Sequence, residues 1–119
     1  MSIQPGSFGR VAFLRIAPNH DLVRGVEAAC AKLGIENALL RGSLGSVNHA
    51  LLETVFGQQR VETLGLEIVT LMGSLTDGQA RLTGALVDAE GQLYHGRFVP
   101  EENLICVTAE ISLEEWLPG

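Results

Sequence analysis

The stretch Leu66-Glu-Ile-Val-Thr-Leu-Met-Gly-Ser-Leu75 decides the fold of this chain of 119 residues. Apolar side chains fall on both faces of an extended strand here: Leu66, Ile68, Val69, Leu71 and Met72. A strand with two apolar faces must be covered on both sides, so it is predicted to lie in the middle of a sheet. Gly73 follows, a residue type that marks a bend or a close approach of another strand.

Upstream of this strand, residues 20–33 predict a helix. Its apolar residues recur at steps of three and four and form one stripe: Leu22, Val26, Ala29, Cys30 and Leu33. Pro18 ends a strand predicted over residues 10–16, and Asn19 or Asp21 is expected to cap the helix. Gly34 followed by Ile35 is the expected helix end.

The remaining segments predict further strands. They are expected over residues 37–41, 47–55, 80–88, 93–99 and 103–113, with turns near 57–60, 76–79, 88–91 and 100–102. One helix and about seven mostly antiparallel strands make an α+β architecture. Residues 1–9 are expected to be a flexible leader, and residues 10–119 a single domain.

Composition and charge limit the classes of function. The formal charge is −6, with only eight Lys and Arg, so DNA binding by the chain alone is not expected. We see no signal segment and no apolar run of about 18 residues, which predicts a cytoplasmic protein without a membrane partner. Cys30 and Cys106 are far apart and follow no metal-ligand spacing, which favours buried free thiols over a disulfide.

The predicted architecture also implies an interface between copies. One helix cannot cover both faces of a seven-stranded sheet, so part of the sheet should be buried between subunits. The residues themselves therefore predict a homo-oligomer.

Several groups of residues, taken in chain order, share the pattern of a known family. They are a strand-to-helix entry with Arg15, Pro18, Asp21 and Leu22; a Gly-x-x-Gly-Ser segment with Gly42, Gly45 and Ser46; a central strand with Glu67, Ile68, Val69, Leu71 and Gly73; and a closing hairpin and last strand with Asp88, Gly91, Gly96, Thr108 and Glu110. Together, over Arg15 to Ile111, they resemble the plant-and-prokaryote-conserved (PPC) domain. The resemblance implies an α+β module that forms homotrimers.

The resemblance also shows what this chain lacks. Plant members bind DNA through a separate Arg-Gly-Arg element, the AT-hook, and this sequence contains none. Many bacterial members carry a His-x-His and a Gly-His that look like a metal site. Aligned on Gly91 and Gly96, those positions hold Arg81, Thr83 and Arg97. Because Arg cannot be deprotonated to serve as a ligand, no metal is expected.

The same three positions suggest a different ligand. If Arg81, Thr83 and Arg97 project from one sheet face, two guanidinium groups and a hydroxyl suit a carboxylate or a phosphate. Glu110 is expected to pair with one Arg and hold it in place. The alternative is that the Arg residues form ion pairs with Glu67, with Glu110 or with a neighbouring subunit.

His95 is the best candidate for acid–base chemistry, although a lone His is more often structural. No nucleophile elbow, phosphate loop or paired catalytic carboxylates are present, and no cofactor is expected. Three hypotheses follow. The first is a trimeric, noncatalytic module that binds a small anion or a protein partner in a regulatory role. The second is a nucleic-acid-associated protein, and the third is an enzyme that uses Arg81, Thr83, His95 and Arg97.

Overall fold

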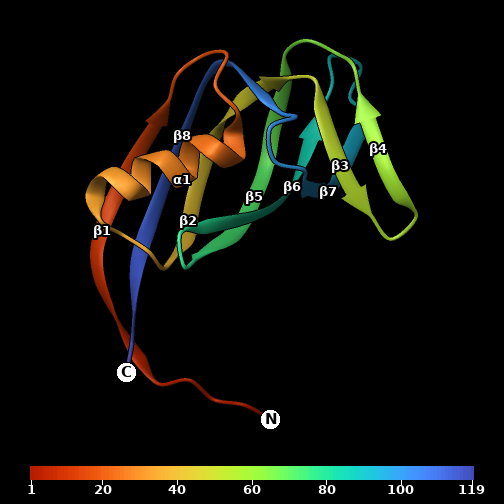
Figure 1. Ribbon diagram of the computed structural model, residues 1–119. Helices are drawn as coiled ribbons and strands as arrows, with labels where there is room; N and C mark the ends of the chain where they lie inside the picture. The colour runs from red at the N-terminus through yellow and green to blue at the C-terminus, as the bar shows by residue number, and fades with distance from the viewer.

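The computed structural model describes residues 1–119 and shows one antiparallel sheet with one helix on one face (Figure 1). The elements are β1 (Gly6–Ile16), α1 (Leu22–Leu33), β2 (Ala38–Asn48), β3 (Ala50–Thr54), β4 (Gly57–Val61), β5 (Leu66–Thr76), β6 (Gln79–Val87), β7 (Leu93–Phe98) and β8 (Leu104–Pro118). The strand order is β1-β8-β2-β5-β6-β7-β3-β4. The predicted α+β class is confirmed, with eight strands in place of about seven.

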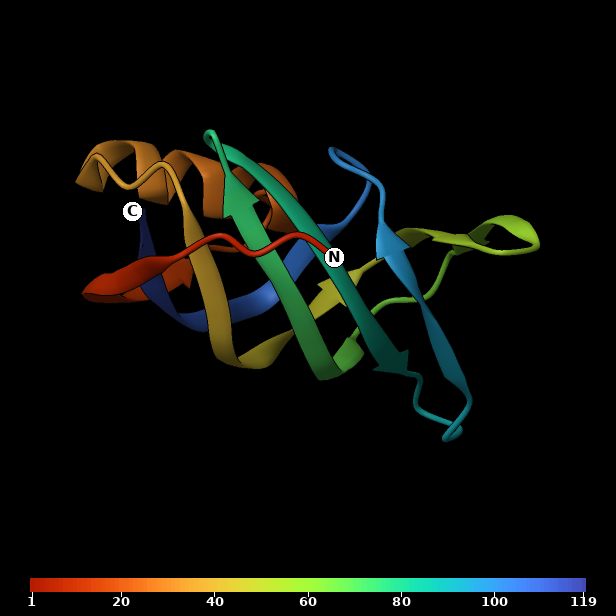
Figure 2. The ribbon, with the colours of Figure 1, turned by 90° about the horizontal axis from the view of Figure 1, so that it is seen from below.

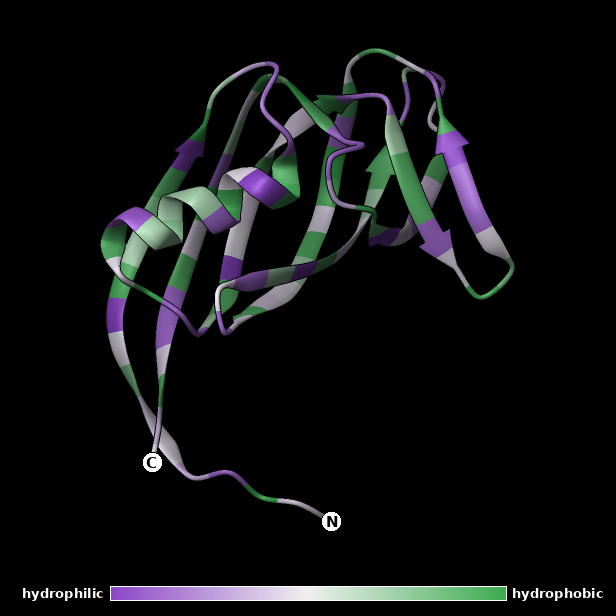
Figure 3. Cartoon of the chain, viewed as in Figure 1, coloured by the Kyte–Doolittle hydropathy of each residue, from purple (hydrophilic) through white to green (hydrophobic).

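Strand β5 lies in the middle of the sheet, between β2 and β6, as its two apolar faces predict. Within the chain, however, only one face is covered. Leu66, Leu71 and Leu75 are buried on the helix side, whereas Val69 and Met72 are 53% and 64% exposed. Figure 2 shows α1 on one side of the sheet, and we call the opposite side the open face. Apolar residues recur along β1 and β5, although one face of these strands is uncovered within the chain (Figure 3).

Helix α1 begins and ends where local capping chemistry dictates. Asp21 is the N-cap, since its carboxylate accepts the Arg24 backbone N–H at 2.9 Å. At the other end Gly34 takes the left-handed conformation, with φ 69°, and the Ile35 N–H donates to the Cys30 carbonyl at 3.0 Å. The helix starts at residue 22 rather than 20, and its apolar stripe faces the sheet. With 12 residues it lacks the length and apolar character of a membrane span.

Two edge segments differ from the sequence-based expectation, and the strands expected over residues 37–41 and 47–55 are instead β2, unbroken over residues 38–48, and β3. Strand β1 starts at Gly6, so the second half of the expected leader is paired with β8, where Phe8 stacks edge-on against Trp116 with ring centres 5.6 Å apart. Residues 57–60, expected as a turn, belong to β4, and the turn falls at residues 55–56. Both segments lie at the edges of the sheet, where strands show a weaker apolar alternation.

An ion pair fixes the helix to the last strand. The Arg10 guanidinium contacts the buried Glu115 carboxylate through Nε at 2.9 Å and Nη2 at 3.0 Å. The same guanidinium donates to the carbonyls of Leu33 and Gly34 at the helix C-terminus, at 2.7 and 3.3 Å. A cation at this end of a helix also interacts favourably with its dipole. Hydrogen bonds from Arg10 lower the pKa of Glu115 from 4.5 to about 2.

This pKa predicts an acid-sensitive fold. Because the pKa of Glu115 is lower in the folded chain than in the unfolded chain, its contribution to stability is present above pH 4.5 and is lost as the pH falls toward 2. Glu115→Gln should lower the melting temperature at neutral pH, and its melting temperature should fall less than that of the wild type over this window. Thermal unfolding followed by circular dichroism measures both. Glu90→Gln, in an exposed turn, is the matched control and should follow the wild type.

Candidate functional site

Four of the predicted site residues lie on neighbouring strands at the open face. Arg81 and Thr83 are on β6, and His95 and Arg97 are on β7. All four are exposed and alternate with buried residues that face the core. Thr83 and Arg97 are directly opposite each other in the β6–β7 register, so their Cβ atoms are about 5 Å apart. The structure therefore brings these four side chains to one face of one strand pair.

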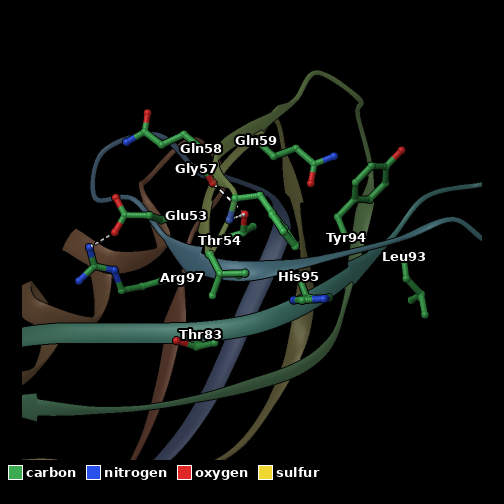
Figure 4. Close-up of a pocket in the computed structure, with 13 residues that line it drawn as sticks. Glu53, Thr54, Gly57, Gln58, Gln59, Thr83, Leu93, Tyr94, His95 and Arg97 are labelled. Carbon is green, nitrogen blue, oxygen red and sulfur yellow. Dashed lines mark hydrogen bonds and ion pairs between the residues drawn. The ribbon is translucent and has the colours of Figure 1, made fainter.

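Beside them, the β3–β4 hairpin forms one wall of a cleft of about 760 Å³. We call it the hairpin cleft; residues 53–59, Thr83 and residues 93–97 line it. Figure 4 shows Glu53 facing Arg97 at one end and Leu93 and Tyr94 at the other. The Glu53 carboxylate accepts a hydrogen bond from Arg97, and this ion pair links the hairpin to β7. Only two residue pairs join β3 to β7 in register.

Arg97 also borders a second, smaller hollow of about 290 Å³, which we call the basic crevice. Three arginines, Arg24, Arg81 and Arg97, line it together with one acidic residue, Glu27. It lies where the first residues of β6 extend beyond β7, since the β6–β7 register begins at Thr83. Arg24 is paired with Glu27 at 2.8 Å, and this hydrogen bond raises the pKa of Arg24. Arg81 makes no ion pair in the chain, so it is the free cation of the crevice.

Glu110 is not part of this group within one chain. It lies on β8, directly opposite Arg15 of β1 and Leu44 of β2. Three strand spacings, about 14 Å in all, separate β8 from β6. Glu110 makes no ion pair with Arg81 or Arg97, and Glu53 holds Arg97 instead. Glu53 and Arg97 are 44 residues apart, so no local signal in the sequence indicates their pairing.

The glycine motif residues shape the sheet and carry no ligand chemistry. Gly42, Gly45 and Ser46 lie on β2, and Gly73 lies on β5. A Cβ on Gly45 would lie 2.4 Å from the Thr108 carbonyl oxygen, and a Cβ on Gly73 would lie 2.1 Å from that of Arg81. Both glycines also have positive φ, at 149° and 154°. They let neighbouring strands approach closely, and Gly73 thereby sets the path of the backbone that carries Arg81.

The sequence reasoning missed the role of Asp88, which appeared only as a turn residue. Its carboxylate accepts the backbone N–H groups of Glu90 and Gln92, each at 2.9 Å, and the Tyr94 hydroxyl at 3.0 Å. The hydrogen bond from Gln92, with that from Tyr94, lowers the pKa of Asp88. Asp88 therefore fixes the β6–β7 turn and the orientation of Tyr94 on the cleft wall. The sequence signal for this role is an Asp in a predicted hairpin turn, because such a carboxylate can accept backbone N–H groups of the turn, here as far as the fourth residue along.

The donor set does not fit a metal ion. No group of three His, Cys, Asp or Glu side chains lies close enough to hold one. At the positions that align with the His-x-His and Gly-His of other family members, the side chains are the Arg81 and Arg97 guanidiniums and the Thr83 hydroxyl. A guanidinium has five N–H donors and no lone pair to offer, so these groups suit an anion.

Comparison with known proteins shows the same fold elsewhere. The family model of the Plants and Prokaryotes Conserved (PCC) domain, the family abbreviated PPC above, matches residues 3–117. A plant- and prokaryote-conserved protein from Pyrococcus horikoshii is 26% identical, with a TM-score of 0.71, over 98% of this chain and 85% of that one. A metal-containing protein from Archaeoglobus fulgidus is 21% identical, with a TM-score of 0.78, over 99% and 87%. A protein from Bacteroides thetaiotaomicron, provisionally named as DNA-binding, is 16% identical, with a TM-score of 0.76, over 92% and 83%. Among curated proteins no match was found.

The close approach at Gly73 gives a testable prediction. Gly73→Ala should reduce the free energy of unfolding by roughly 2 kcal/mol, because the new Cβ meets a backbone carbonyl and φ is unfavourable for alanine. Denaturant unfolding measures the change. Gly91→Ala is the control: its φ is also positive, at 84°, but no atom lies within 4 Å of the new Cβ. Equal losses in the two variants would show that the close approach is unimportant.

Proposed function

The chain belongs to the Plants and Prokaryotes Conserved domain family, and from that premise we propose that it is a homotrimeric, noncatalytic module that binds a small anion in a regulatory role. The observation that carries the proposal is the basic crevice, where Arg24, Arg81 and Arg97 lie around one hollow. A carboxylate or a phosphate is the ligand class, and an acidic group on a protein partner has the same chemistry.

The charges around the crevice support this ligand class. Arg81 has no acidic partner, and a bound anion would supply one. Arg97 uses one arm of its guanidinium for Glu53 and keeps further N–H donors for a ligand. The chain as a whole has a charge of −6, whereas at this hollow three guanidiniums stand against one acidic lining residue, Glu27.

The polar side chains of the adjoining hairpin cleft support binding over catalysis. Thr83, Gln58 and Gln59 offer hydroxyl and amide groups, which orient a ligand through hydrogen bonds. His95 stands on the same wall and makes no hydrogen bond that would orient it as a base. A larger ligand that reaches from the basic crevice past Arg97 would contact these groups.

The open face supports the homotrimer. It carries several exposed large apolar side chains: Val11, Phe13, Leu44, Val69 and Met72. Contiguous exposed apolar surface on a folded domain marks a contact with another molecule. We place the module in the cytoplasm, in keeping with the free thiols of Cys30 and Cys106.

A DNA-associated role is the second candidate, and the provisional name of the Bacteroides thetaiotaomicron protein is the observation that favours it. The charge balance favours the small anion, because five of the seven arginines already form ion pairs with acidic side chains.

Phosphate binding tests the basic crevice. Inorganic phosphate titrated into the protein in a calorimeter should bind at one site per chain. Arg81→Ala combined with Arg97→Ala should weaken binding roughly tenfold or more, because two charge-assisted donors are lost. Arg60→Ala, which removes an ion-paired Arg of β4, is the control and should bind as the wild type does. Equal affinity in all three proteins would contradict the proposed site.

A fluorescence anisotropy titration with duplex DNA separates the two candidates. The protein should show no binding at low salt, because too few free cations face the solvent to neutralise phosphates. Binding that weakens steeply as salt is added would favour the DNA-associated role. Loss of that binding in the Arg81 and Arg97 double variant would assign it to the basic crevice.

A further inference from the structure

Strand β7 is paired along nearly all of its length on one side but only at one end on the other. Residues 93–97 pair one by one with β6, whereas β3 pairs with β7 at Arg97 and Phe98 alone. From Gly96 to Leu93 the strands β3 and β7 diverge, and the hairpin cleft opens between them. The closed end is tight, since a Cβ on Gly96 would lie 2.7 Å from the Glu53 carbonyl oxygen. The cleft therefore has a narrow end at Arg97 and a wide end at Leu93 and the hairpin tip.

The wide end of the hairpin cleft is apolar and aromatic. Val55 and Phe56 stand at the hairpin tip and are 93% and 97% exposed, and Leu93 on β7 is 62% exposed. Tyr94 also lines this end (Figure 4). The chain has only four Phe, one Tyr and one Trp, so two aromatic residues at one cleft are a local concentration. Apolar contacts are available to a ligand on both walls of the wide end.

Hydrogen-bonded turns hold both aromatic residues in place. The Thr54 hydroxyl accepts the Phe56 backbone N–H at 3.1 Å and donates to the Gly57 carbonyl at 2.9 Å, which fixes the backbone of the hairpin tip. On the opposite wall, the Asp88 carboxylate accepts the Tyr94 hydroxyl at 3.0 Å. A site whose contact groups are already positioned loses less conformational freedom on binding. The aromatic end of the cleft is thus preorganised for a ligand.

The narrow end of the cleft is polar and adjoins the basic crevice. Arg97 lines both hollows, so they meet at its side chain. Its guanidinium already binds one carboxylate, that of Glu53, and keeps further N–H donors. Arg81 makes no ion pair and stands two residues before Thr83 on β6, about 7 Å further along the same face. A carboxylate at the narrow end therefore meets one guanidinium that is shared with Glu53 and one that is free.

We propose that the hairpin cleft and the basic crevice together bind one organic acid, with its apolar or aromatic body against Phe56 and Tyr94 and its carboxylate at Arg97 and Arg81. The inference rests on the proposed anion-binding function and names the rest of the ligand. From Leu93 to Arg97 an extended strand spans about 13 Å, which separates the body of the ligand from its acid by several bonds. The cleft volume of about 760 Å³ suits a small organic molecule. A simple inorganic anion leaves the aromatic end unused.

Three related probes test the inference on the wild-type protein: phenylbutyrate, which has a ring and a carboxylate; phenylbutanol, which lacks the charge; and butyrate, which lacks the ring. Amide chemical shifts of nitrogen-labelled protein measure each affinity and show where each probe binds. Phenylbutyrate should bind roughly tenfold or more tightly than either of the others, because it alone makes both kinds of contact. The largest shifts should fall on amides that line the two hollows, among them Phe56, Tyr94 and Arg97.

Phe56→Ser separates the apolar end from the charged end. It should weaken phenylbutyrate binding roughly tenfold and leave the affinity for inorganic phosphate unchanged, because Phe56 does not line the basic crevice. Leu64→Ser is the matched control: it removes a side chain that is 70% exposed but lies outside both hollows, and it should bind both probes as the wild type does. Arg81→Ala combined with Arg97→Ala should weaken the binding of both probes. The amide spectra also check that each variant is folded.

The outcomes separate this inference from the function on which it rests. Phosphate binding without any preference for phenylbutyrate over butyrate would overturn the inference and leave the basic crevice as an anion site. So would a Phe56→Ser variant that binds phenylbutyrate as the wild type does, or chemical shift changes confined to residues outside both hollows. Unchanged binding of phosphate and phenylbutyrate in the Arg81 and Arg97 double variant would overturn the anion-binding function and the inference together.

Discussion

One helix of 12 residues on a sheet of eight strands is the constraint from which the rest of this structure follows. The helix buries one face and leaves the other to be covered by something else. Strands that are apolar on both faces then keep side chains such as Phe13 and Met72 in solvent. At the β6–β7 end, Arg81 and Arg97 project from the uncovered face and border the crevice together with Arg24 of the helix. The exposed apolar face and the exposed arginine side chains of β6 and β7 are two results of one shortage of covering elements.

Charged groups determine where the one helix sits. At its C-terminus, Arg10 bridges the last carbonyls and Glu115, while in its middle the Glu27 carboxylate accepts the Ala80 backbone N–H of β6 at 2.9 Å. Glu27 also binds Arg24. The contact that places the helix on β6 therefore also places one of the three guanidiniums at the crevice. Fold and site share these side chains, so they cannot vary independently.

The sequence predicted well what depends on neighbours along the chain. The helix cap at Asp21 and the helix end at Gly34 need only local residues, and both are confirmed. It predicted poorly what depends on distant partners. Asn103 is fully buried and its side chain joins Leu51 to Val99, yet nothing around it in the sequence indicates that role. The Arg97 partner was missed for the same reason, and β4 was missed because a polar edge strand resembles a turn.

The attachment of the β3–β4 hairpin has a consequence for motion. The hairpin ends the sheet, and it is joined to β7 through two residue pairs and the Glu53–Arg97 ion pair. Residues 55–60 around its tip are exposed, whereas Ala50, Leu52 and Val61 at its base are buried in the core, so the tip can open while the base stays packed. Local opening of this kind has a lower free energy than global unfolding. The amide protons around the hairpin tip are therefore expected to exchange more readily than those of the central strands. A ligand that draws Arg97 away from Glu53 changes how often the hairpin opens.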